Sequence, residues 1–400
     1  MKLHKVLCEA VISGLHDILI SNLHAHHTVE KLLQSNKKWG ARDRHFIADY
    51  IYEIVRYKRL YAFACNQEEL IFKVQLWDLL AACFIQKEIA LPAWEEFQFI
   101  DTATVSARLA EGKLIRKIRE SVPDWLDVMG EKSFGEKWDA EIHALNQPAK
   151  LCVRVNTLRS NKKRIKELFL KEDIAFEERN DAPDALVLNS RKNLTKTEIY
   201  KDGEIEIQDI SSQLVAPYLD AKPGMIVIDA CAGAGGKSLH LAALMKNEGE
   251  ILALDIHHEK LNELEKRARR NGVNIIKTVF FNADVFKYYH HFADRLLLDV
   301  PCSGSGVLKR NPDAKWKLTP DFIKEIGAVQ ESILQQNEAM LKPGGKMVYA
   351  TCSILADENE NQIARFLKKH KNFLMVEEHK ISPAENGYDG FYVCVLQKSL

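Results

Sequence analysis

The segment MIVIDACAGAGGKSLHLAALM (residues 225–245) joins three local patterns that follow one another along the chain. Its apolar start runs into Asp229 and is typical of a buried strand, whereas Ser238 to Met245 has the composition of a helix. Between them lies a glycine-rich turn, which lets backbone N–H groups at the start of a helix approach a ligand closely. The segment therefore predicts the first strand–turn–helix unit of an α/β domain, with a ligand site at the turn.

The same alternation continues toward the end of the chain. EILALDI (250–256) reads as a second strand, and residues 258–270 read as a helix. Three further apolar segments each run into a loop, namely IIKTVFFNAD (275–284), RLLLDVPCSGSG (295–306) and GKMVYATCS (345–353). Strands that alternate with helices predict right-handed crossovers and a parallel, doubly wound, Rossmann-like sheet. Ligands of such sheets bind beyond the carboxyl ends of the strands, which is where these loops lie.

The 400 residues are too many for one ordinary core, so we expect two or three domains, and the local patterns divide the chain into three. Residues 1–120 are predicted to be all helical, with apolar residues at helical spacing and one helical run from Leu70 to Ile89. This region has no reactive constellation, which favours a packing or docking module. Residues 121–220 begin at a helix-breaking SVPD sequence and are expected to form a small α+β insert. Residues 221–400 form the α/β domain.

Within the insert, two short apolar segments predict strands, LCVRV (151–155) and ALVL (185–188), and residues 162–171 predict a helix. Basic residues gather near its start, including Arg154 and Arg159. Taken alone, such a cluster favours an ordinary solvated face over a patch that contacts phosphates.

Bulk composition limits the class of protein without naming a substrate. The chain has 46% hydrophobic and 28% charged residues and a formal net charge of zero, so composition gives no support for a nucleic-acid partner and does not exclude one. No secretory leader and no apolar stretch long enough to span a bilayer is apparent, which predicts a cytoplasmic protein. The eight cysteines form no C-x-x-C pair, so we expect reduced thiols and no metal site. Nothing in the sequence suggests more than a monomer.

The turn and two acidic strand ends predict an adenosine-containing ligand. DACAGAGGK (229–237) matches neither the phosphate-binding loop of nucleotide triphosphatases nor the dinucleotide fingerprint, which weakens both interpretations. Asp255 ends the second strand, where an acidic residue can bind both ribose hydroxyls of a nucleoside. Asp284 ends the third strand, where a carboxylate can bind an adenine amino group. S-adenosylmethionine fits this pattern, because it has no phosphates to be held.

Two cysteines follow predicted strands and should face the same cleft. Cys302 lies in DVPCSG (299–304), and Cys352 lies in ATCS (350–353). Carbon 5 of cytosine becomes nucleophilic enough to take a methyl group only after a thiolate has added to carbon 6. Asp299 could bind the protonated N3 and the amino group of the base and so stabilise the adduct. Position alone does not say which thiol attacks and which aids proton removal or product release.

These motifs resemble the RNA cytosine-5 methyltransferases of the RsmB/Nop2/Sun type. The resemblance runs from about residue 121 to the end and rests on these segments: SVPDWL (121–126), RVNTLR (154–159), DACAGAGGK (229–237), LDI (254–256), NAD (282–284), DVPCSGSGVLKRNPDAKW (299–316) and GGKMVYATCS (344–353). The helices before residue 121 more weakly resemble the antitermination factor NusB. One departure is Gly233-Ala234, where the family often has Ala-Pro, and it should loosen the turn without loss of binding.

The resemblance implies a role for each motif. Cys352 would be the nucleophile, Cys302 would assist release of the methylated base, and Asp299 and Lys237 would complete the catalytic group. The S-adenosylmethionine site would comprise Cys231, Ala232, Gly233, Ala234, Gly235, Gly236, Lys237, Asp255, Asp284 and Asp299.

The resemblance also implies an RNA substrate, most naturally 16S ribosomal RNA, despite the neutral charge. Arg154, Arg159, Lys309 and Arg310 then become candidates for holding the RNA backbone. A target base must leave its stack to reach the cleft, which predicts a single-stranded or distorted RNA site.

Three alternatives remain open from the sequence. A cytosine-5 methyltransferase acting on transfer RNA would use the same chemistry, and one acting on DNA would attack with the thiol of the PC motif, Cys302. A non-catalytic, RNA-binding ribosome-assembly factor would bind the cofactor without turnover. An amino-group methyltransferase is disfavoured, because it would need an aromatic residue where this chain has Cys302.

Overall fold

The structure of the protein is a computed structural model, which describes residues 3–67, 72–189, 192–282 and 284–400. Leu70, the predicted start of a helical run, and Ala283 of the NAD motif lie outside the described residues. The chain forms two compact units. Unit 1 comprises residues 1–147 and 308–319, and unit 2 comprises residues 148–307 and 320–400.

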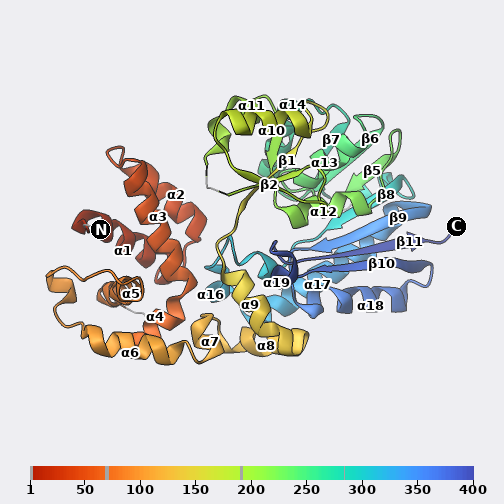
Figure 1. Ribbon diagram of the computed structural model, residues 1–400. Coiled ribbons are helices and arrows are strands. Elements are labelled where there is room, and N and C mark those ends of the chain that lie inside the picture. The colour runs from red at the N-terminus through yellow and green to blue at the C-terminus, as the bar shows by residue number, and fades with distance from the viewer. Residues whose placement is uncertain (1–2, 68–71, 190–191, 283) are drawn as a thin grey trace. The chain divides into compact units, whose positions relative to one another are not determined.

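Unit 1 is helical, as expected for the N-terminal region (Figure 1). Asp101 caps one of its helices, since its carboxylate accepts a hydrogen bond from the backbone N–H of Ala103 at 3.1 Å. The apolar stripe that includes Ile47, Ile51 and Ile54 is fully buried in the core of this unit. The helices are α1 (Lys5–Leu19), α2 (Ala25–Ser35), α3 (Ala41–Arg56), α4 (Lys58–Ala64), α5 (Lys73–Gln86), α6 (Thr102–Gly112), α7 (Arg116–Arg119), α8 (Asp124–Phe134), α9 (Trp138–Asn146) and α16 (Ala314–Lys317).

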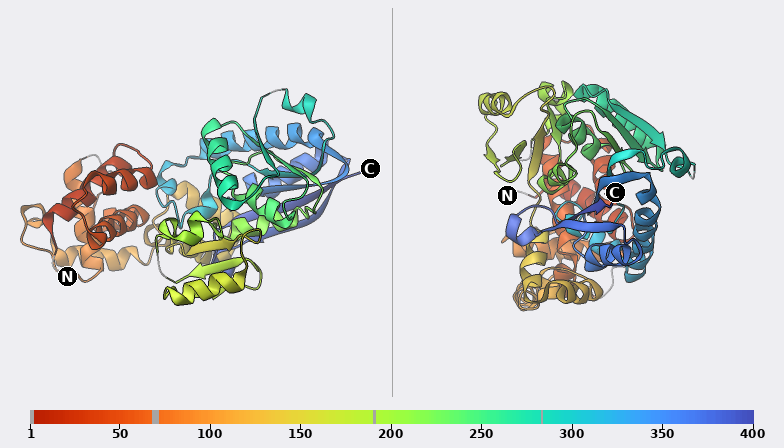
Figure 2. Two further views of the ribbon diagram at one scale, coloured as in Figure 1. Left: turned by 90° about the horizontal axis from the view of Figure 1, so that it is seen from above. Right: turned by 90° about the vertical axis from the view of Figure 1, so that its right-hand side faces the viewer.

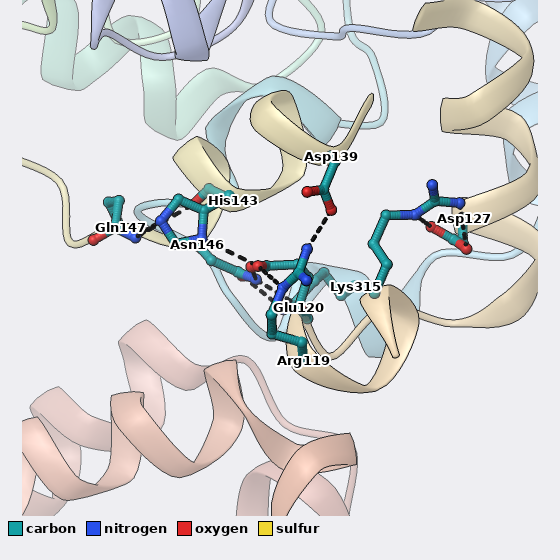
Figure 3. A network of polar contacts seen from close by, with 9 residues as sticks. Arg119, Glu120, Asp127, Asp139, His143, Asn146, Gln147 and Lys315 are labelled. Carbon is teal, nitrogen blue, oxygen red and sulfur yellow. Dashed lines mark hydrogen bonds and ion pairs between the residues drawn. The ribbon is translucent and has the colours of Figure 1, made fainter. Parts of the chain in front are cut away.

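The boundaries of unit 1 differ from the domain boundaries expected from sequence. Residues 308–319, which follow the PC motif directly, fold with the N-terminal helices and not with the α/β domain. The Asp313 carboxylate accepts a hydrogen bond from the backbone N–H of Ala25 at 3.0 Å, and the Trp316 indole donates to the Val55 carbonyl at 2.7 Å. Lys315 is completely buried and donates to the Asn146 side chain at 2.9 Å (Figure 3).

The insert at the start of unit 2 is a small antiparallel sheet backed by a helix. The sheet has the strand order β2-β3-β1-β4, and β1 pairs with β3 and β4 in antiparallel register. The two strands and the helix predicted here are confirmed with the same bounds. The elements are β1 (Leu151–Val155), α10 (Lys162–Lys171), β2 (Phe176–Glu178), β3 (Ala185–Leu188), α11 (Glu198–Lys201) and β4 (Ile205–Ile207).

The large sheet of unit 2 has the order β10-β11-β9-β8-β5-β6-β7 and confirms the predicted Rossmann-like fold (Figures 1 and 2). Its elements are α12 (Ile210–Tyr218), β5 (Ile226–Asp229), α13 (Gly236–Leu244), β6 (Glu250–Asp255), α14 (His258–Asn271), β7 (Ile276–Phe280), α15 (Val285–Tyr288), β8 (Ala293–Asp299), α17 (Pro320–Asn337), β9 (Leu341–Thr351), α18 (Glu360–Lys369), β10 (Phe373–Ile381), α19 (Pro383–Asn386) and β11 (Phe391–Lys398).

Both faces of the sheet are covered at its central strands, which explains why β5 and β6 are largely apolar, whereas the edge strand β10 is mostly exposed. Successive residues of a strand point to opposite faces, so Val227 packs with α12, α13 and α14, whereas Ile228 packs with α17 and α18. Figure 1 shows these two groups of helices on opposite sides of the sheet. Among the described helices, none combines the length and the apolar character that crossing a membrane requires.

One expectation about this sheet needs correction, because it is mixed and not wholly parallel. The pairs among β9, β8, β5, β6 and β7 are parallel, but β11 lies antiparallel between β9 and β10. Residues 382–390, which join β10 to β11, are too few for the crossover that a parallel pair needs, so the chain returns in the opposite direction. The parallel part still brings its strand ends to one edge, where the polar loops lie.

Candidate active site

The two predicted reactive cysteines meet at the carboxyl ends of neighbouring strands. β8 ends at Asp299, and β9 ends at Thr351, and the two strands run parallel with Asp299 opposite Ala350. The loops that follow therefore start side by side. The sulfur atoms of Cys302 and Cys352 lie 3.2 Å apart, within hydrogen-bonding distance for thiols. The structure thus brings together two residues that are 50 positions apart in the sequence.

The environment of the pair favours the protonated form of the Cys302 thiol. The hydrogen bond with Cys352 raises the pKa of Cys302 well above the ordinary thiol value, and burial and the negative charge of Glu358 raise it further. Cys302 therefore keeps its proton at neutral pH and can donate it toward the Cys352 sulfur. Burial also raises the pKa of Cys231, so this third cysteine near the strand ends stays protonated.

A close approach of three backbone segments holds the cysteine loops together. The N–H of Gly306 donates to the carbonyl of Cys352 at 2.9 Å, and the N–H of Gly390 donates to the carbonyl of Gly306 at 2.7 Å. A Cβ at position 306 would lie 2.1 Å from the Gly390 carbonyl oxygen, so only glycine fits there. The last glycine of the PCSGSG segment is thus required by packing of the backbone against the Cys352 loop.

Lys237 and Asp299 form an ion pair at the same edge. The Lys237 ammonium donates to the Asp299 carboxylate at 2.6 Å. Lys237 enters from the first turn of α13 and is largely buried, whereas the Asp299 side chain is 29% exposed. The ring of Phe391 lies 5.2 Å from the ammonium. The pair leaves part of the Asp299 carboxylate accessible, which is the condition for contact with a bound molecule.

The glycine-rich turn adopts the conformation that its sequence indicates. Gly233 and Gly235 have φ angles of 54° and 85°, a region that favours glycine. A Cβ at Gly235 would lie 2.4 Å from Leu264 of α14, so this position is required by packing as well. The departure from the family pattern places Gly233 where φ is positive and no atom lies within 4 Å of a Cβ. The turn is therefore formed without strain at the position where the family often has alanine.

Asp255 organises the turn from the next strand. One carboxylate oxygen accepts from the Gly233 N–H and the other from the His257 N–H, both at 2.8 Å. Beside it, Ile256 is 63% exposed, which leaves an apolar surface at the end of β6. Asp284 is exposed at the start of α15, with its N–H bonded to the Asn282 side chain at 2.9 Å. Asp255 thus ends β6, and Asp284 follows the adjacent strand β7 after a short loop.

At this edge, sequence reasoning gave no role to Asp229, which starts the DACAGAGGK motif, and missed Arg267 and Glu358. Burial raises the pKa of Asp229 to about 7, although its carboxylate accepts from the Ser238 hydroxyl at 2.6 Å. Arg267 of α14 donates to the Ala234 carbonyl and to the buried Glu206 carboxylate, both at 2.7 Å. Glu358 bonds to both cysteine loops. Arg267 lies in an amphipathic helix and Glu358 in a polar loop, so no local signal in the sequence distinguishes either residue.

The predicted RNA-contacting residues fall into three different settings. Arg154 is 1% exposed, with its guanidinium donating to Gln208 at 2.8 Å and its pKa lowered to about 10 by burial. It is therefore part of the core between the insert and the α/β domain, and we withdraw it as a phosphate contact. Arg159 is exposed beside Gly272. Lys309 is buried and Arg310 half-buried, both in the segment that folds with unit 1.

Comparison with known proteins places this architecture in a family. A family model described as 16S rRNA methyltransferase RsmB/F matches residues 216–397, and one described as the ferredoxin-like domain of RsmF/B-like methyltransferases matches residues 122–195. The chain is 35% identical over 298 residues to a probable ribosomal RNA small subunit methyltransferase B of Bacillus subtilis, covering 69% of this chain and 65% of the relative. It is 32% identical over 301 residues to the corresponding protein of Synechocystis, covering 70% and 67%.

Solved structures show the same fold. The crystal structure of PH0851 superposes with a TM-score of 0.84 at 22% identity over 100% of both chains. A methyltransferase homologue from Pyrococcus horikoshii gives a TM-score of 0.62 at 27% identity, covering 71% of this chain and 97% of that one. NSun6 from the same organism, solved with SFG, gives 0.65 at 20% identity, covering 70% and 98%.

The match to curated relatives is partial in length, and the matched range of the family model includes the strand-end residues of the candidate site. The chain spans 65% of the length of the Bacillus subtilis relative. The matched residues 216–397 contain the glycine-rich turn, both cysteines, Asp299 and Glu358. On these grounds the chain belongs to the 16S rRNA methyltransferase RsmB/F family.

Proposed function

We propose that this protein is an S-adenosylmethionine-dependent enzyme that methylates carbon 5 of a cytosine in 16S ribosomal RNA. The observation that carries the proposal is the pair of thiols 3.2 Å apart beside the Lys237–Asp299 ion pair. A protonated thiol next to a second thiol suits a reaction in which one sulfur attacks a base and the other handles a proton. Membership in the RsmB/F family supports an RNA methyltransferase, and the two cysteines support cytosine as the base.

The strand-end residues fit an adenosyl cofactor. Gly233 has open space above it, Asp255 sits under the turn, and the exposed face of Ile256 suits a flat, apolar ring. The solved structure of NSun6 holds SFG, an analogue of S-adenosylmethionine, which supports the same class of ligand here. Residues Cys231 to Lys237 with Asp255, Asp284 and Asp299 would hold the cofactor. When bound, S-adenosylmethionine supplies an electrophilic methyl group.

The chain's own residues supply the nucleophile and the groups that transfer protons. The Cys352 thiolate forms a carbon–sulfur bond to cytosine carbon 6, which places electron density on carbon 5. Asp299 accepts a hydrogen bond from the base edge, and Lys237 holds that carboxylate in place. After methylation, the carbon–sulfur bond breaks as a base takes the carbon 5 proton, and the product is released. Cys302, which retains its proton, can supply it to the departing Cys352 sulfur, and the Cys302 thiolate left behind can accept the carbon 5 proton.

The RNA would be held by basic residues outside the cleft, with Arg159 the exposed candidate in unit 2. A base in a duplex would have to leave its stack, at a cost of a few kcal/mol, so we expect a single-stranded or distorted target. Monomeric action and half-buried Arg310 as an RNA contact remain part of the proposal, whereas Lys309 is withdrawn as an RNA contact because its side chain is buried.

The decisive experiment is mass spectrometry of the protein incubated with S-adenosylmethionine and 16S RNA that carries 5-fluorocytosine. Fluorine at carbon 5 blocks the final elimination, so the enzyme should remain covalently bound to its substrate. We expect the crosslink at Cys352 and its loss in Cys352→Ala, with Cys302→Ala still forming the adduct. The buried Cys394→Ala, in the middle of β11, serves as the matched control.

Other outcomes would separate the alternatives. A crosslink at Cys302 would reverse the assigned roles, and a crosslink on DNA but not on RNA would change the substrate. An absence of any adduct on ribosomal RNA, with S-adenosylmethionine binding intact, would favour an assembly factor or a different RNA.

A further inference from the structure

We propose that Glu358 is a positioning residue that holds both catalytic cysteine loops in register through the residue that follows each cysteine. The inference deepens the proposed function and rests on it for the roles of Cys302 and Cys352. Glu358 ends a short 3-10 turn, residues 356–358, that follows the Cys352 loop. Its side chain is completely buried.

Four hydrogen bonds converge on the Glu358 carboxylate. Oε2 accepts from the backbone N–H of Ser303 at 2.7 Å and from the Gln330 amide of α17 at 3.0 Å. Oε1 accepts from the hydroxyls of Ser303, at 2.5 Å, and Ser353, at 2.6 Å. Ser303 follows Cys302, and Ser353 follows Cys352. One carboxylate therefore links the two loops at points one residue away from the two reactive sulfurs.

The surrounding contacts fix Glu358 itself. Its backbone carbonyl accepts from the Tyr349 hydroxyl of β9 at 2.6 Å. The next residue, Asn359, donates from its side chain to the Ser353 carbonyl at 2.9 Å. Gln330 also donates to the Pro301 carbonyl at 2.9 Å, so α17 contacts the Cys302 loop from the other side. We call Glu358 and its partners Ser303, Ser353 and Gln330 the Glu358 clamp. It is anchored on β9 and on α17, whose core residues are buried.

The four donors that contact Glu358 require a hydrogen-bond acceptor at the Oε1 position and another at the Oε2 position. A backbone N–H and an amide N–H can only donate, so the atom at the Oε2 position must accept. A glutamine could keep that acceptor only by placing its NH2 group at the Oε1 position, where two hydroxyls now donate. Both serines would then need new acceptors in a buried site, which costs free energy. A carboxylate is the side chain that satisfies all four donors at once.

The clamp has an effect on chemistry that ordinary packing would not have. The separation of 3.2 Å between the cysteine sulfurs depends on the relative position of two loops that are 50 residues apart in the sequence. A displacement of about 1 Å in a reacting group can lower a rate by about 100-fold. The Glu358 charge also helps to keep the proton on Cys302. Loss of the carboxylate should therefore change both the geometry and the proton state of the pair.

The test compares Glu358→Gln and Ser353→Ala with wild type and with Glu360→Gln. Glu360→Gln makes the same chemical change two residues further along the chain. The Glu360 carboxylate is partly exposed and bonds to Lys380. The first readout needs no RNA: alkylation of Cys302 and Cys352 by iodoacetamide across pH, followed site by site by mass spectrometry. The second is kcat and KM for methylation of 16S RNA, and the third is the Kd of S-adenosylmethionine.

In Glu358→Gln we expect the pH of half-maximal alkylation of Cys302 to fall, because the negative charge that helps to hold its proton is gone. We expect kcat to fall by about 100-fold, with KM for RNA and Kd for the cofactor within about twofold of wild type. Ser353→Ala should lower kcat less, since it removes one contact of the four, and Glu360→Gln should behave as wild type.

An unchanged alkylation profile in both Glu358→Gln and Ser353→Ala would overturn the inference, as would an equal loss of kcat in Glu360→Gln. A wild-type protein without methylation activity would sink the proposed function alone, because the alkylation readout still decides whether Glu358 sets the state of the two thiols.

Discussion

Two completely buried ionisable side chains, Glu358 and Lys315, organise two different regions of the molecule. In unit 2, Glu358 accepts hydrogen bonds from Ser303, Ser353 and Gln330 at the ends of β8 and β9. In unit 1, Lys315 donates to the backbone carbonyls of Arg56 at 2.8 Å and Glu120 at 3.2 Å and to the Asn146 side chain at 2.9 Å. Figure 3 shows Lys315 beside Glu120 and Asn146.

Donors surround the Glu358 carboxylate, and acceptors surround the Lys315 amine. These hydrogen bonds offset much of the free-energy cost of removing each side chain from water. The difference lies in what the partners are attached to. The partners of Glu358 include the neighbours of two thiols, whereas those of Lys315 are the ends of helices in unit 1. We therefore expect the buried Glu358 to affect the reactivity of the cysteines and the buried Lys315 to affect the stability of unit 1.

The largest expected effect is the loss of stability in Lys315→Met. Three acceptors would lose their buried donor, and we expect a loss of about 3 kcal/mol in the free energy of unfolding of unit 1. All six tryptophans lie in this unit, so urea unfolding followed by tryptophan fluorescence reports on it selectively. Exposed Lys113→Met is the control.

The comparison would be broken by a Lys315→Met protein that remains as stable as Lys113→Met. It would also be broken if the substitution, in folded protein, changed the alkylation of Cys302 and Cys352 as Glu358→Gln is expected to do.

Asp229 sharpens the comparison as a buried carboxylate with fewer donors than Glu358. Its Oδ1 has no hydrogen-bond partner among the described residues, and burial raises its pKa to about 7, against about 3.9 in an unfolded chain. The folded state therefore holds the proton more tightly. The stability that this provides is complete below pH 4 and is lost as the pH rises through 7.

Asp229→Asn should remove this pH dependence. Relative to wild type, the variant should gain at least about 1.4 kcal/mol between pH 4 and pH 8, the equivalent of one pKa unit. Urea unfolding followed by circular dichroism at both pH values measures the difference. A constant difference between the two proteins would show that Asp229 is ionised in the folded state throughout.

The smallest expected effect separates a buried arginine from an exposed one. Arg159→Ala should weaken RNA binding a few-fold and lower the slope of log Kd against log salt by about 0.7 to 0.9, the value of one phosphate contact. Arg154→Met should leave that slope unchanged, because its guanidinium is buried against Gln208. Filter binding at several salt concentrations tests both. Equal slopes for wild type and Arg159→Ala would remove Arg159 from the RNA interface.

Local patterns in the sequence were sufficient for the α/β fold and for the meeting of the two cysteines at the strand ends. Short apolar segments predicted β1 and β3, and the helical stretch 162–171 predicted α10, all with their observed bounds. Placing both cysteines after strands of one sheet was enough to predict that they face the same cleft, and their sulfurs are in contact. These inferences succeed because strand and helix periodicity is a local property, and because parallel strands end at a common edge.

Tertiary structure decided which polar residues are buried and which segments pack together. Arg154 reads as part of a basic surface, yet its strand is covered on both faces. Glu358 stands in the polar run ADENENQ, where nothing separates it from its exposed neighbour Asp357. Residues 308–319 continue a methyltransferase motif but fold with the N-terminal helices. Burial and partnership depend on chain segments that are distant in sequence, so the sequence by itself determined the strands, the turn and the reactive thiols, and only the folded chain decided what holds them in place.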